Sequence, residues 1–323
     1  MDTISSLKQY LPEALLSEMN IKTAIPKIAK NHERIIEIER AIQEIPTKHV
    51  LYQADARTME YLEPQSVHLV LTSPPYWNLI KYEHNEHQLG DIKDYDLFLD
   101  ELNRVWKWCF KVLVPGGRLI CIIGDVCLSR RKNDGIHSVV PLHASVQERF
   151  RAIGFTNLSP IIWHKISNAN YEAKNGSSFL GKPYEPNAVI KNDIEYVLME
   201  RKPGGYRKAS TESRLLSVIS DKNHKEWFKQ IWSDIAGAPK NSHPAPFPLK
   251  IAERLIRMFS FVGDTVLDPF MGTGTTNLAA AKWGRNSIGV EIEPHYFDMA
   301  NTRLYREVKS LFRNITIETL KRS

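Results

Sequence analysis

This chain of 323 residues has few cysteines, no long apolar run and no compositionally biased segment, and each absence removes a class of protein. Its three cysteines, Cys109, Cys121 and Cys127, form no Cys-x-x-Cys pair, and their odd number argues against a disulfide framework. Apolar runs such as Leu119 to Ile123 are too short to cross a bilayer. The first residues lack a charged start followed by an apolar stretch, so we expect no secretion signal and a cytoplasmic location.

The charge of the chain gives a modest indication of a polyanionic partner. There are 43 Lys and Arg against 37 Asp and Glu, which gives a net charge of +6. Residues 163–242 contain thirteen basic and nine acidic side chains, a local balance of +4 (13 − 9). This concentration of positive charge favours nucleic acid as a partner of that segment.

Alternating strand and helix patterns predict an α/β fold. Short apolar runs predict buried strands at residues 49–55, 67–71, 118–124, 161–163, 195–199, 265–267 and 287–291. Apolar residues at helical spacing predict helices at residues 95–113, 141–153, 249–259 and 275–283. The alternation favours a doubly wound, mostly parallel twisted sheet with helices on both faces.

The same patterns suggest how the chain is divided. We expect an N-terminal helical segment (1–45), a first half of the main domain (46–164), a basic irregular region (165–242) with one returning core strand near 194–200, a second half (243–310) and a C-terminal tail (311–323). The N-terminal segment carries isoleucines at helical spacing, which is typical of a packing or dimer helix. A DNA-contacting arm is the alternative.

The sequence TSPPYW at residues 72–77 follows a predicted strand. Proline has a fixed φ and no N–H, so two prolines in succession make a stiff turn whose carbonyls point outward. A free carbonyl and the Ser73 hydroxyl can both accept from an amino group, and such bonds favour the reactive, pyramidal form of an aryl amine. Tyr76 and Trp77 can stack on a base. A simple loop turn is the alternative interpretation.

The sequence DPFMGTGTT at residues 268–276 follows a second strand and precedes a helix. Its glycines allow a tight turn at a helix N-terminus, and Glu291 after the next strand is placed to accept from two ribose hydroxyls. A phosphate-binding P-loop is excluded because the required lysine is absent, and a dinucleotide fingerprint would need glycine where Asn277 stands. Asp55, at another strand end, either accepts from an adenine amino group or caps the strand.

In these motifs and their order, the chain resembles the amino-group DNA methyltransferases of prokaryotic restriction–modification systems. The resemblance spans residues 48–305 and rests on TSPPYW, LVPGGRLICIIGD, IIWHK, EYVLMERK, HPAPFPLKIAERLI, DPFMGTGTT and IGVEIEP, in that order. In this order, called the β group, the catalytic motif comes first, a target-recognition region follows, and the cofactor motif comes last.

The resemblance implies a Rossmann-like fold that uses S-adenosyl-L-methionine, with a small irregular target-recognition region. It implies a base-binding motif of Ser73, Pro74, Pro75 and Tyr76. It implies that the cofactor is bound by Asp55, Thr72, Asp268, Pro269, Phe270, Gly272, Gly274, Thr275 and Glu291, with His243, Pro244, Ala245, Phe247 and Pro248 near its methionine end. From the residues alone, His243-Pro244 is also readable as a structural turn. No His or Cys shows metal-ligand spacing, so we expect no metal.

Ser73 decides between two target bases in this family. Ser-Pro-Pro-Tyr mostly accompanies the 4-amino group of cytosine, and Asp-Pro-Pro-Tyr mostly accompanies the 6-amino group of adenine. The resemblance therefore implies a DNA (cytosine-N4-specific) methyltransferase, with adenine as the alternative. RNA or protein methyltransferases form a further alternative, but they more often carry Asn-Pro-Pro-Tyr and have the cofactor motif first. A DNA-binding module without catalysis would not need both motifs intact.

Duplex DNA is the expected partner, with the target base flipped out of the helix. Candidate phosphate contacts are Arg130, Arg131, Lys132, Lys202, Arg207, Lys208, Lys222 and Lys225, although each alone is also typical of a solvated surface charge. The resemblance also implies functional pairing with a restriction endonuclease and a location on the nucleoid through DNA. A homodimer through residues 1–45 is an open alternative to a monomer.

Overall fold

A nine-stranded sheet forms the centre of the structure, a computed structural model that describes residues 7–16, 20–77, 88–128, 133–165, 186, 190, 192–237, 247–309 and 314–322. The strands of this sheet are β1 (Thr47–Gln53), β2 (Val67–Thr72), β3 (Leu113–Ile123), β6 (Thr156–His164), β7 (Ile194–Arg201), β8 (Ile231–Trp232), β9 (Thr265–Asp268), β10 (Asn286–Glu291) and β11 (Ile315–Lys321). A separate hairpin pairs β4 (Val126–Leu128) with β5 (Ser138–Val140).

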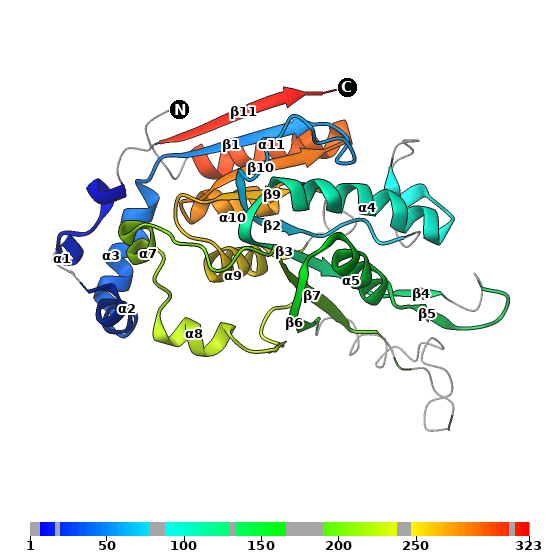
Figure 1. Ribbon diagram of the computed structural model, residues 1–323, viewed down its shortest axis with the longest axis horizontal. Coiled ribbons are helices and arrows are strands. Elements are labelled where there is room, and N and C mark those ends of the chain that lie inside the picture. The colour runs from blue at the N-terminus through cyan, green and yellow to red at the C-terminus, as the bar shows by residue number, and fades with distance from the viewer. Residues whose placement is uncertain are drawn as a thin grey trace.

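The order of strands in the sheet is β11-β1-β10-β9-β2-β3-β7-β6-β8. All neighbours from β11 to β3 are parallel, whereas β7 runs antiparallel to both β3 and β6. The early strand β1 lies between the two late strands β10 and β11 (Figure 1). The predicted α/β class and mostly parallel sheet are confirmed, and the carboxyl ends of the parallel strands meet at one edge.

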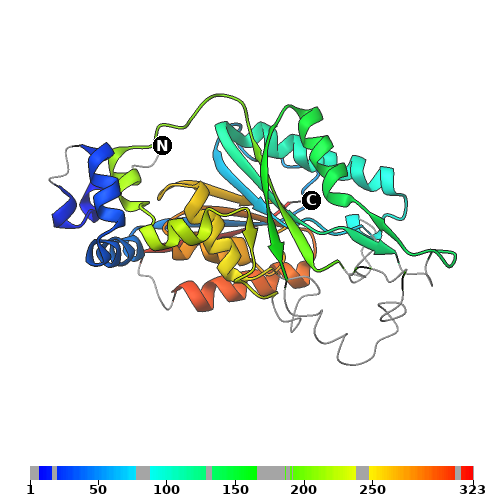
Figure 2. The ribbon, with the colours of Figure 1, turned by 90° about the horizontal axis from the view of Figure 1, so that it is seen from below.

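Helices cover both faces of this sheet. One face carries α4 (Tyr95–Val112) and α5 (Leu142–Ile153), and the other carries α9 (Leu249–Phe259), α10 (Thr275–Lys282) and α11 (Pro294–Lys309) (Figures 1 and 2). The helices α4, α5, α9 and α11 each bury an apolar stripe against their neighbours, whereas residues 275–281 of α10 are all buried. In the described part of the chain, no helix has the length and apolar character needed to span a membrane.

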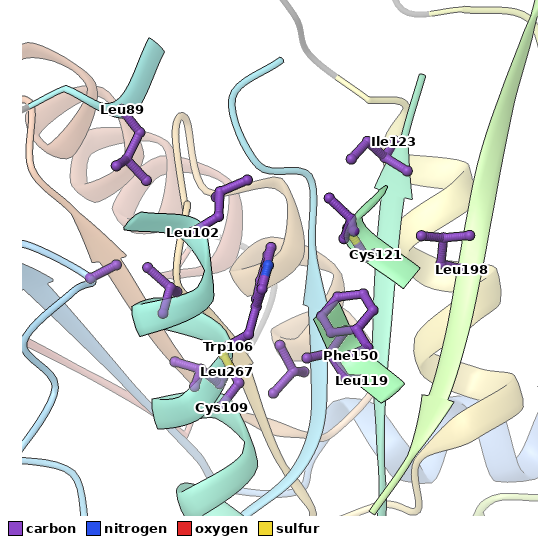
Figure 3. Packing of buried hydrophobic residues seen from close by; sticks show 14 of the residues in the cluster. Leu89, Leu102, Trp106, Cys109, Leu119, Cys121, Ile123, Phe150, Leu198 and Leu267 are labelled. Carbon is purple, nitrogen blue, oxygen red and sulfur yellow. The ribbon is translucent and has the colours of Figure 1, made fainter. Parts of the chain in front are cut away.

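The core under α4 and α5 is aromatic and contains two of the thiols. Trp106 of α4 lies against Phe150 of α5, with ring centroids 5.1 Å apart, in a cluster that also contains Leu119 and Cys121 of β3 (Figure 3). Cys109 and Cys121 are fully buried in this cluster, where burial raises the thiol pKa of each. Both are therefore packing residues, as the sequence predicted, while Cys127 is half-buried.

The N-terminal helices pack at one end of the molecule (Figures 1 and 2). They are the 3-10 helix η1 (Leu7–Tyr10), α1 (Glu13–Leu16), α2 (Ile21–Ala29) and α3 (His32–Gln43). The isoleucine stripe is interrupted at Asn31, whose side chain accepts from the Arg34 N–H at 3.1 Å and begins α3. Ile28, Ile38 and Ile42 are buried together with Leu215 and Leu216 from the second half of the chain. The packing interpretation of this segment is confirmed.

Two predictions about local structure were wrong. Residues 203–242 are not wholly irregular, since they form α7 (Thr211–Leu216), α8 (Asp221–Trp227) and β8. Each short helix begins at a serine, Ser210 or Ser220, whose hydroxyl accepts from the backbone N–H three residues later, and α7 buries its leucines under α2 and α3. The residues predicted as a C-terminal tail contain β11, which pairs with β1 along its whole length.

Candidate active site

A pocket opens at the carboxyl edge of the parallel strands, and both sequence motifs reach it. It encloses about 680 Å³, part of it open to solvent. Parallel strands deliver the residues that follow them to the same edge, so β1, β2, β9 and β10 bring Asp55, Ser73, Pro269 and Glu291 together.

Seven of the residues predicted from the motifs line this pocket. They are Asp55, Ser73, Pro75, Pro269, Phe270, Gly272 and Glu291. The pocket is completed by Val290, Ile292 and Glu293 of the sequence IGVEIEP and by residues that no motif indicated, namely Ala54, Ala56, Gln88, Leu89, Gly90 and Tyr296. Leu89 and Gly90 belong to the short helix η2 (Leu89–Asp91), and the Gln88 amide donates to Glu293 at 3.0 Å across the pocket.

Glu291 is held in the pocket by backbone amides of the glycine turn. Its Oε2 accepts from the Gly272 N–H at 2.8 Å, and its Oε1 accepts from the Glu293 N–H at 2.9 Å. Gly272 has φ of 51°, in the left-handed region where glycine is favoured. Burial raises the pKa of Glu291 to about 7, against the lowering effect of the two N–H donors. A carboxylate has further lone pairs, so Glu291 can still accept from ligand hydroxyls.

Asp268 lies beneath the pocket and ties the two motifs together. Its Oδ1 accepts from the Thr72 hydroxyl at 2.7 Å and from the Phe270 N–H at 3.1 Å. Burial raises the pKa of Asp268 to about 6, while its hydrogen bonds to Thr72, Thr276 and the Phe270 N–H lower it. Asp268 and Thr72 are fully buried and do not line the pocket. Their position is that of a brace between β2 and β9.

Asp55 lines the pocket, but its carboxylate is already engaged. Arg57 donates to both carboxylate oxygens, at 2.6 to 3.0 Å, and also reaches Glu101 at 2.6 Å. The strand-end cap that the sequence allowed is present, because the Arg57 N–H donates to Asp55 Oδ1 at 2.8 Å. An adenine amino group would therefore share this carboxylate with an arginine.

Other residues of the predicted cofactor set lie near the pocket without lining it. Gly274, at φ 77°, begins α10, and a Cβ there would come within 3.1 Å of Ala300. Thr275 accepts from Arg303 at 3.1 Å, and Pro248 begins α9. Phe247 packs on the buried cluster beneath the sheet. The predicted His243, Pro244 and Ala245 lie outside the described residues.

The tetrapeptide at residues 73–76 follows β2 directly. Ser73 and Pro75 face the pocket, and Tyr76 is buried. Burial raises the pKa of Tyr76 well above its ordinary value, so its hydroxyl keeps its proton. Trp77 is used in packing: its ring meets Tyr95 edge-on at 5.0 Å, and its Nε1–H donates to the Lys93 carbonyl at 3.1 Å.

The predicted phosphate contacts that the structure describes do not line this pocket. Arg201 is the last residue of β7, which runs antiparallel to β3, so Lys202 and the residues after it begin at the opposite edge of the sheet. The Lys202 ammonium donates to the carbonyls of Phe110 and Leu113, both at 2.7 Å, where α4 ends.

The other predicted phosphate contacts that the structure describes are either paired with acidic side chains or exposed. Arg207 makes two bonds of 2.6 Å to the buried Asp264, and Lys225 pairs with Asp221 within α8. Lys208 and Lys222 are exposed. Arg130, Arg131 and Lys132 lie outside the described residues. Of the described candidates, Lys202 and Arg207 have structural roles that their charge alone did not indicate.

No metal centre is evident in the described part of the chain, where no group of three or more His, Cys, Asp or Glu side chains could hold an ion. The described residues that line the pocket offer carboxylates, hydroxyls, carbonyls and aromatic rings.

The glycine turn lies beside the Glu291 carboxylate and near the proline-rich tetrapeptide, whose oxygens can accept hydrogen bonds. This combination is typical of a transferase that uses a nucleotide-type cofactor. Comparison with known proteins identifies the family. The family described as DNA methylase (N6_N4_Mtase) matches residues 67–302. The chain belongs to this family of DNA methyltransferases acting on amino groups, whose methyl donor is S-adenosylmethionine.

Similar proteins cover most of the chain. The type II methyltransferase M.MjaI of Methanocaldococcus jannaschii is 38% identical over 86% of this chain and 98% of its own length. M.MthZI of Methanothermobacter thermautotrophicus is 35% identical over 81% of this chain and 78% of its own. The crystal structure of TTHA0409 from Thermus thermophilus, complexed with S-adenosyl-L-methionine, is 50% identical, covers 85% of this chain and 99% of that one, and has a TM-score of 0.71. The PvuII DNA methyltransferase (cytosine-N4-specific) shares the fold at 21% identity, with a TM-score of 0.58.

Proposed function

We propose that this DNA methyltransferase acts on the 4-amino group of cytosine in duplex DNA. The observation that carries the proposal is Ser73, a neutral hydroxyl at the first position of the tetrapeptide, facing the pocket. In the family that the chain resembles, this position mostly holds serine when cytosine is the target. Methylation of a specific sequence would protect DNA from a restriction endonuclease, in keeping with the type II methyltransferases to which the chain is similar.

The pocket residues fit S-adenosylmethionine. Glu291 keeps lone pairs free after accepting from Gly272 and Glu293, and these can accept from two ribose hydroxyls. Phe270 offers an aromatic wall, and Asp55 lies where an adenine amino group would reach it. When bound, the cofactor supplies an electrophilic methyl group on a sulfonium. The protein's own contribution is to place the target amine against that methyl group.

Ser73 and the Pro74 carbonyl would bind the two protons of the target amine. The lone pair of an aryl amine is delocalised into its ring, and hydrogen bonds to the N–H groups stabilise the amine as its nitrogen becomes positively charged. The new N–C bond forms as the C–S bond breaks, and the amine then releases one proton. Positioning of the amine supplies much of the rate, and no covalent enzyme intermediate is needed.

The target base must leave the duplex to reach Ser73. Flipping costs a few kcal/mol, which stacking on Tyr76 and hydrogen bonds in the pocket would offset. We propose that residues 165–242, residues 130–132 and residues 78–94 meet DNA. Of these, Lys202 and Arg207 have intramolecular partners, so we do not retain them as DNA contacts.

Product analysis tests the proposal. The purified protein is incubated with S-adenosylmethionine and unmethylated genomic DNA of mixed sequence, and the DNA is digested to nucleosides for mass spectrometry. We expect 4-methylcytosine, and sequencing that detects modified bases then maps the recognition sequence. 6-Methyladenine as the product would make Ser73 compatible with adenine and overturn the choice of base. No methylated nucleoside, with cofactor binding intact, would count against duplex DNA as the substrate.

A further inference from the structure

Another cavity lies at the amino ends of the parallel strands, at the edge of the sheet opposite the active-site pocket. It encloses about 800 Å³, part of it open to solvent. The strand β2 runs from one to the other: His68, near its start, lines the cavity, and Ser73, just after its end, lines the pocket. These positions are five residues apart along an extended chain, roughly 16 Å. A small ligand in the cavity therefore does not reach the active site.

The wall of this cavity is basic. Four arginines line it together with His68, and its described lining residues include no Asp or Glu. Two of the arginines, Arg207 and Arg257, are paired with acidic side chains from outside the cavity. For the other two, Arg118 and Arg201, the described part of the chain supplies no acidic partner. The cavity thus holds two positive charges that a bound anion can neutralise.

Arg118 and Arg201 lie directly opposite each other on neighbouring strands. They form a cross-strand pair of the antiparallel strands β3 and β7, so their side chains share one face of the sheet, the face that α9 covers. Arginine keeps its charge in proteins, and like charges at such positions destabilise a sheet. Burial and, after it, the charge of Arg201 lower the pKa of Arg118. Such a pair costs stability in the free protein and suits a bound anion.

Aromatic rings hold these guanidinium groups and extend the cavity beyond them. Arg118 lies 4.7 Å from the centroid of the Phe259 ring, and Arg201 lies 4.6 Å from that of Tyr206. An arginine over a ring keeps N–H groups that can bind two phosphate oxygens side by side. Tyr206 is 85% exposed, so much of its ring is available for stacking. An open ring beside two guanidinium groups is suited to a base and its phosphate.

We propose that this cavity binds a nucleotide: Arg118 and Arg201 hold its phosphate groups, and Tyr206 stacks on its base. One phosphate group carries a charge of about −1.5 to −2 near pH 7, which the two guanidinium charges match. Free phosphate would leave the Tyr206 ring unused. Tyr206 belongs to residues 165–242, which we propose to meet DNA, but it lines the cavity at the edge of the sheet away from the active-site pocket. A duplex whose base is flipped into that pocket lies at the other edge.

Calorimetric titration with ADP tests the proposal. S-adenosylmethionine at saturating concentration keeps the adenine of ADP out of the cofactor pocket. We expect wild type to bind one ADP per chain. Arg118→Gln or Arg201→Gln should weaken this binding about tenfold or more, because each removes charged hydrogen bonds to phosphate.

Arg214→Gln is the matched control for the loss of one positive charge. Arg214 is an exposed arginine of α7 that does not line the cavity, so this variant should bind ADP as wild type does. Absence of ADP binding to wild type, or equal affinity in wild type and all three variants, would overturn the proposal.

Tyr206→Ala distinguishes a nucleotide from other phosphate-bearing ligands. We expect it to weaken ADP binding about fivefold to a hundredfold, as stacking on an aromatic ring requires, and to leave the affinity for pyrophosphate unchanged. Pyrophosphate that binds as tightly as ADP, with no effect of Tyr206→Ala on either, would overturn the assignment to a nucleotide. A duplex oligonucleotide that displaces ADP, and that binds Arg118→Gln more weakly than wild type, would assign the cavity to DNA instead.

The stability of the free protein is a second readout. Removal of either charge relieves the repulsion between the two arginines, so we expect Arg118→Gln and Arg201→Gln to melt at or above the wild-type temperature. ADP should raise the melting temperature of wild type more than that of either variant. A lower melting temperature in both variants, with ADP binding unchanged, would give the pair a structural role only and contradict the proposal.

Discussion

Glu291 connects cofactor binding to pH at the scale of a single side chain. Its pKa is raised by burial to about 7, and only the ionised form can accept from two ribose hydroxyls. Affinity for S-adenosylmethionine should therefore rise with pH and level off above 8. At pH 6 we expect binding about tenfold weaker than at pH 8, since each unit below the pKa costs a factor of ten. Calorimetric titrations at pH 6, 7 and 8 measure this.

The variant Glu291→Gln tests whether the pH dependence of cofactor binding comes from Glu291 or from another titrating group such as Asp268. The amide is neutral, and its NH₂ would face the Gly272 or Glu293 N–H, so we expect weaker binding at every pH and a flat pH profile between 6 and 8. A variant that keeps the wild-type pH dependence would assign the dependence to a different group.

The sequence indicated which residues lie close together where a strand end determines their place. Asp55, Ser73, Phe270 and Glu291 each follow or end a buried strand, and parallel strands bring such residues to one pocket. Gln88 gave no signal, since its partner Glu293 is 205 residues away and the contact depends on how the chain returns.

At the scale of secondary-structure elements, periodicity identified the long elements, and context determined the short ones. The apolar stripes of α4 and α9 were readable because each spans three turns or more. The helix α7 has six residues, too few for a period, and it is stabilised by its Ser210 cap and by contact with α2 and α3. The alternation Ile-Thr-Ile at the start of β11 was a readable strand signal that the prediction of a tail overlooked.

Substitutions in the segment between β7 and α7 distinguish a structural role of its basic residues from a role in DNA binding. Arg207→Ala leaves Asp264 buried without its counter-ion, so we expect the unfolding free energy to fall by roughly 2 to 4 kcal/mol while affinity for DNA stays unchanged. Denaturant unfolding and a binding assay at fixed salt measure both. The neighbouring Lys208→Ala is the control, because Lys208 is exposed and should not alter stability. Weaker DNA binding with wild-type stability in Arg207→Ala would restore Arg207 as a phosphate contact.

The strand β7 contains Glu200, a buried glutamate with a large pKa shift. Burial raises the pKa of Glu200 to about 8, from an ordinary value of 4.5. The folded protein keeps this proton between those two values while the unfolded chain releases it, so stability from Glu200 is complete below pH 4.5 and lost as pH rises through 8. The variant Glu200→Gln does not lose stability in this way as pH rises, because its amide does not titrate.

Thermal unfolding at two pH values measures this effect. We expect Glu200→Gln and wild type to be similar at pH 5 and the variant to be more stable at pH 9 by roughly 2 kcal/mol. Equal stability at pH 9 would mean that folding does not raise the pKa of Glu200.

At the scale of the whole molecule, the sheet places its first strand in the sequence between its last two. The strand β1 pairs with β10 on one side and β11 on the other, and Ile315 and Ile317 of β11 pack on the cluster that contains Leu51. The family resemblance predicted the order of the motifs along the chain but not the order of the strands in the sheet. Neither motif order nor apolar patterns give strand order, because strand order depends on contacts between distant parts of the chain.

Deletion of residues 314–323 tests the importance of β11. It should expose the backbone donors and acceptors of β1, lower the melting temperature and cause association that increases with protein concentration. Calorimetry and light scattering on a sizing column measure these effects. Lys48→Ala is the control: it removes the exposed Lys48–Glu318 ion pair but keeps the strand, and we expect a change of less than about 0.5 kcal/mol. A monomeric truncated protein of unchanged stability would show that β1 tolerates an open edge.

The brace between Thr72 and Asp268 has a consequence for protein synthesis. These residues are 196 positions apart, and β2 finds its partner β9 only after most of the chain has been made. The base-binding loop therefore leaves the ribosome long before the strands that hold the cofactor, and it waits without the partner that fixes it. Translation that stops before Glu291 yields fragments that cannot modify DNA, so methylation begins only with chains in which both motifs have met.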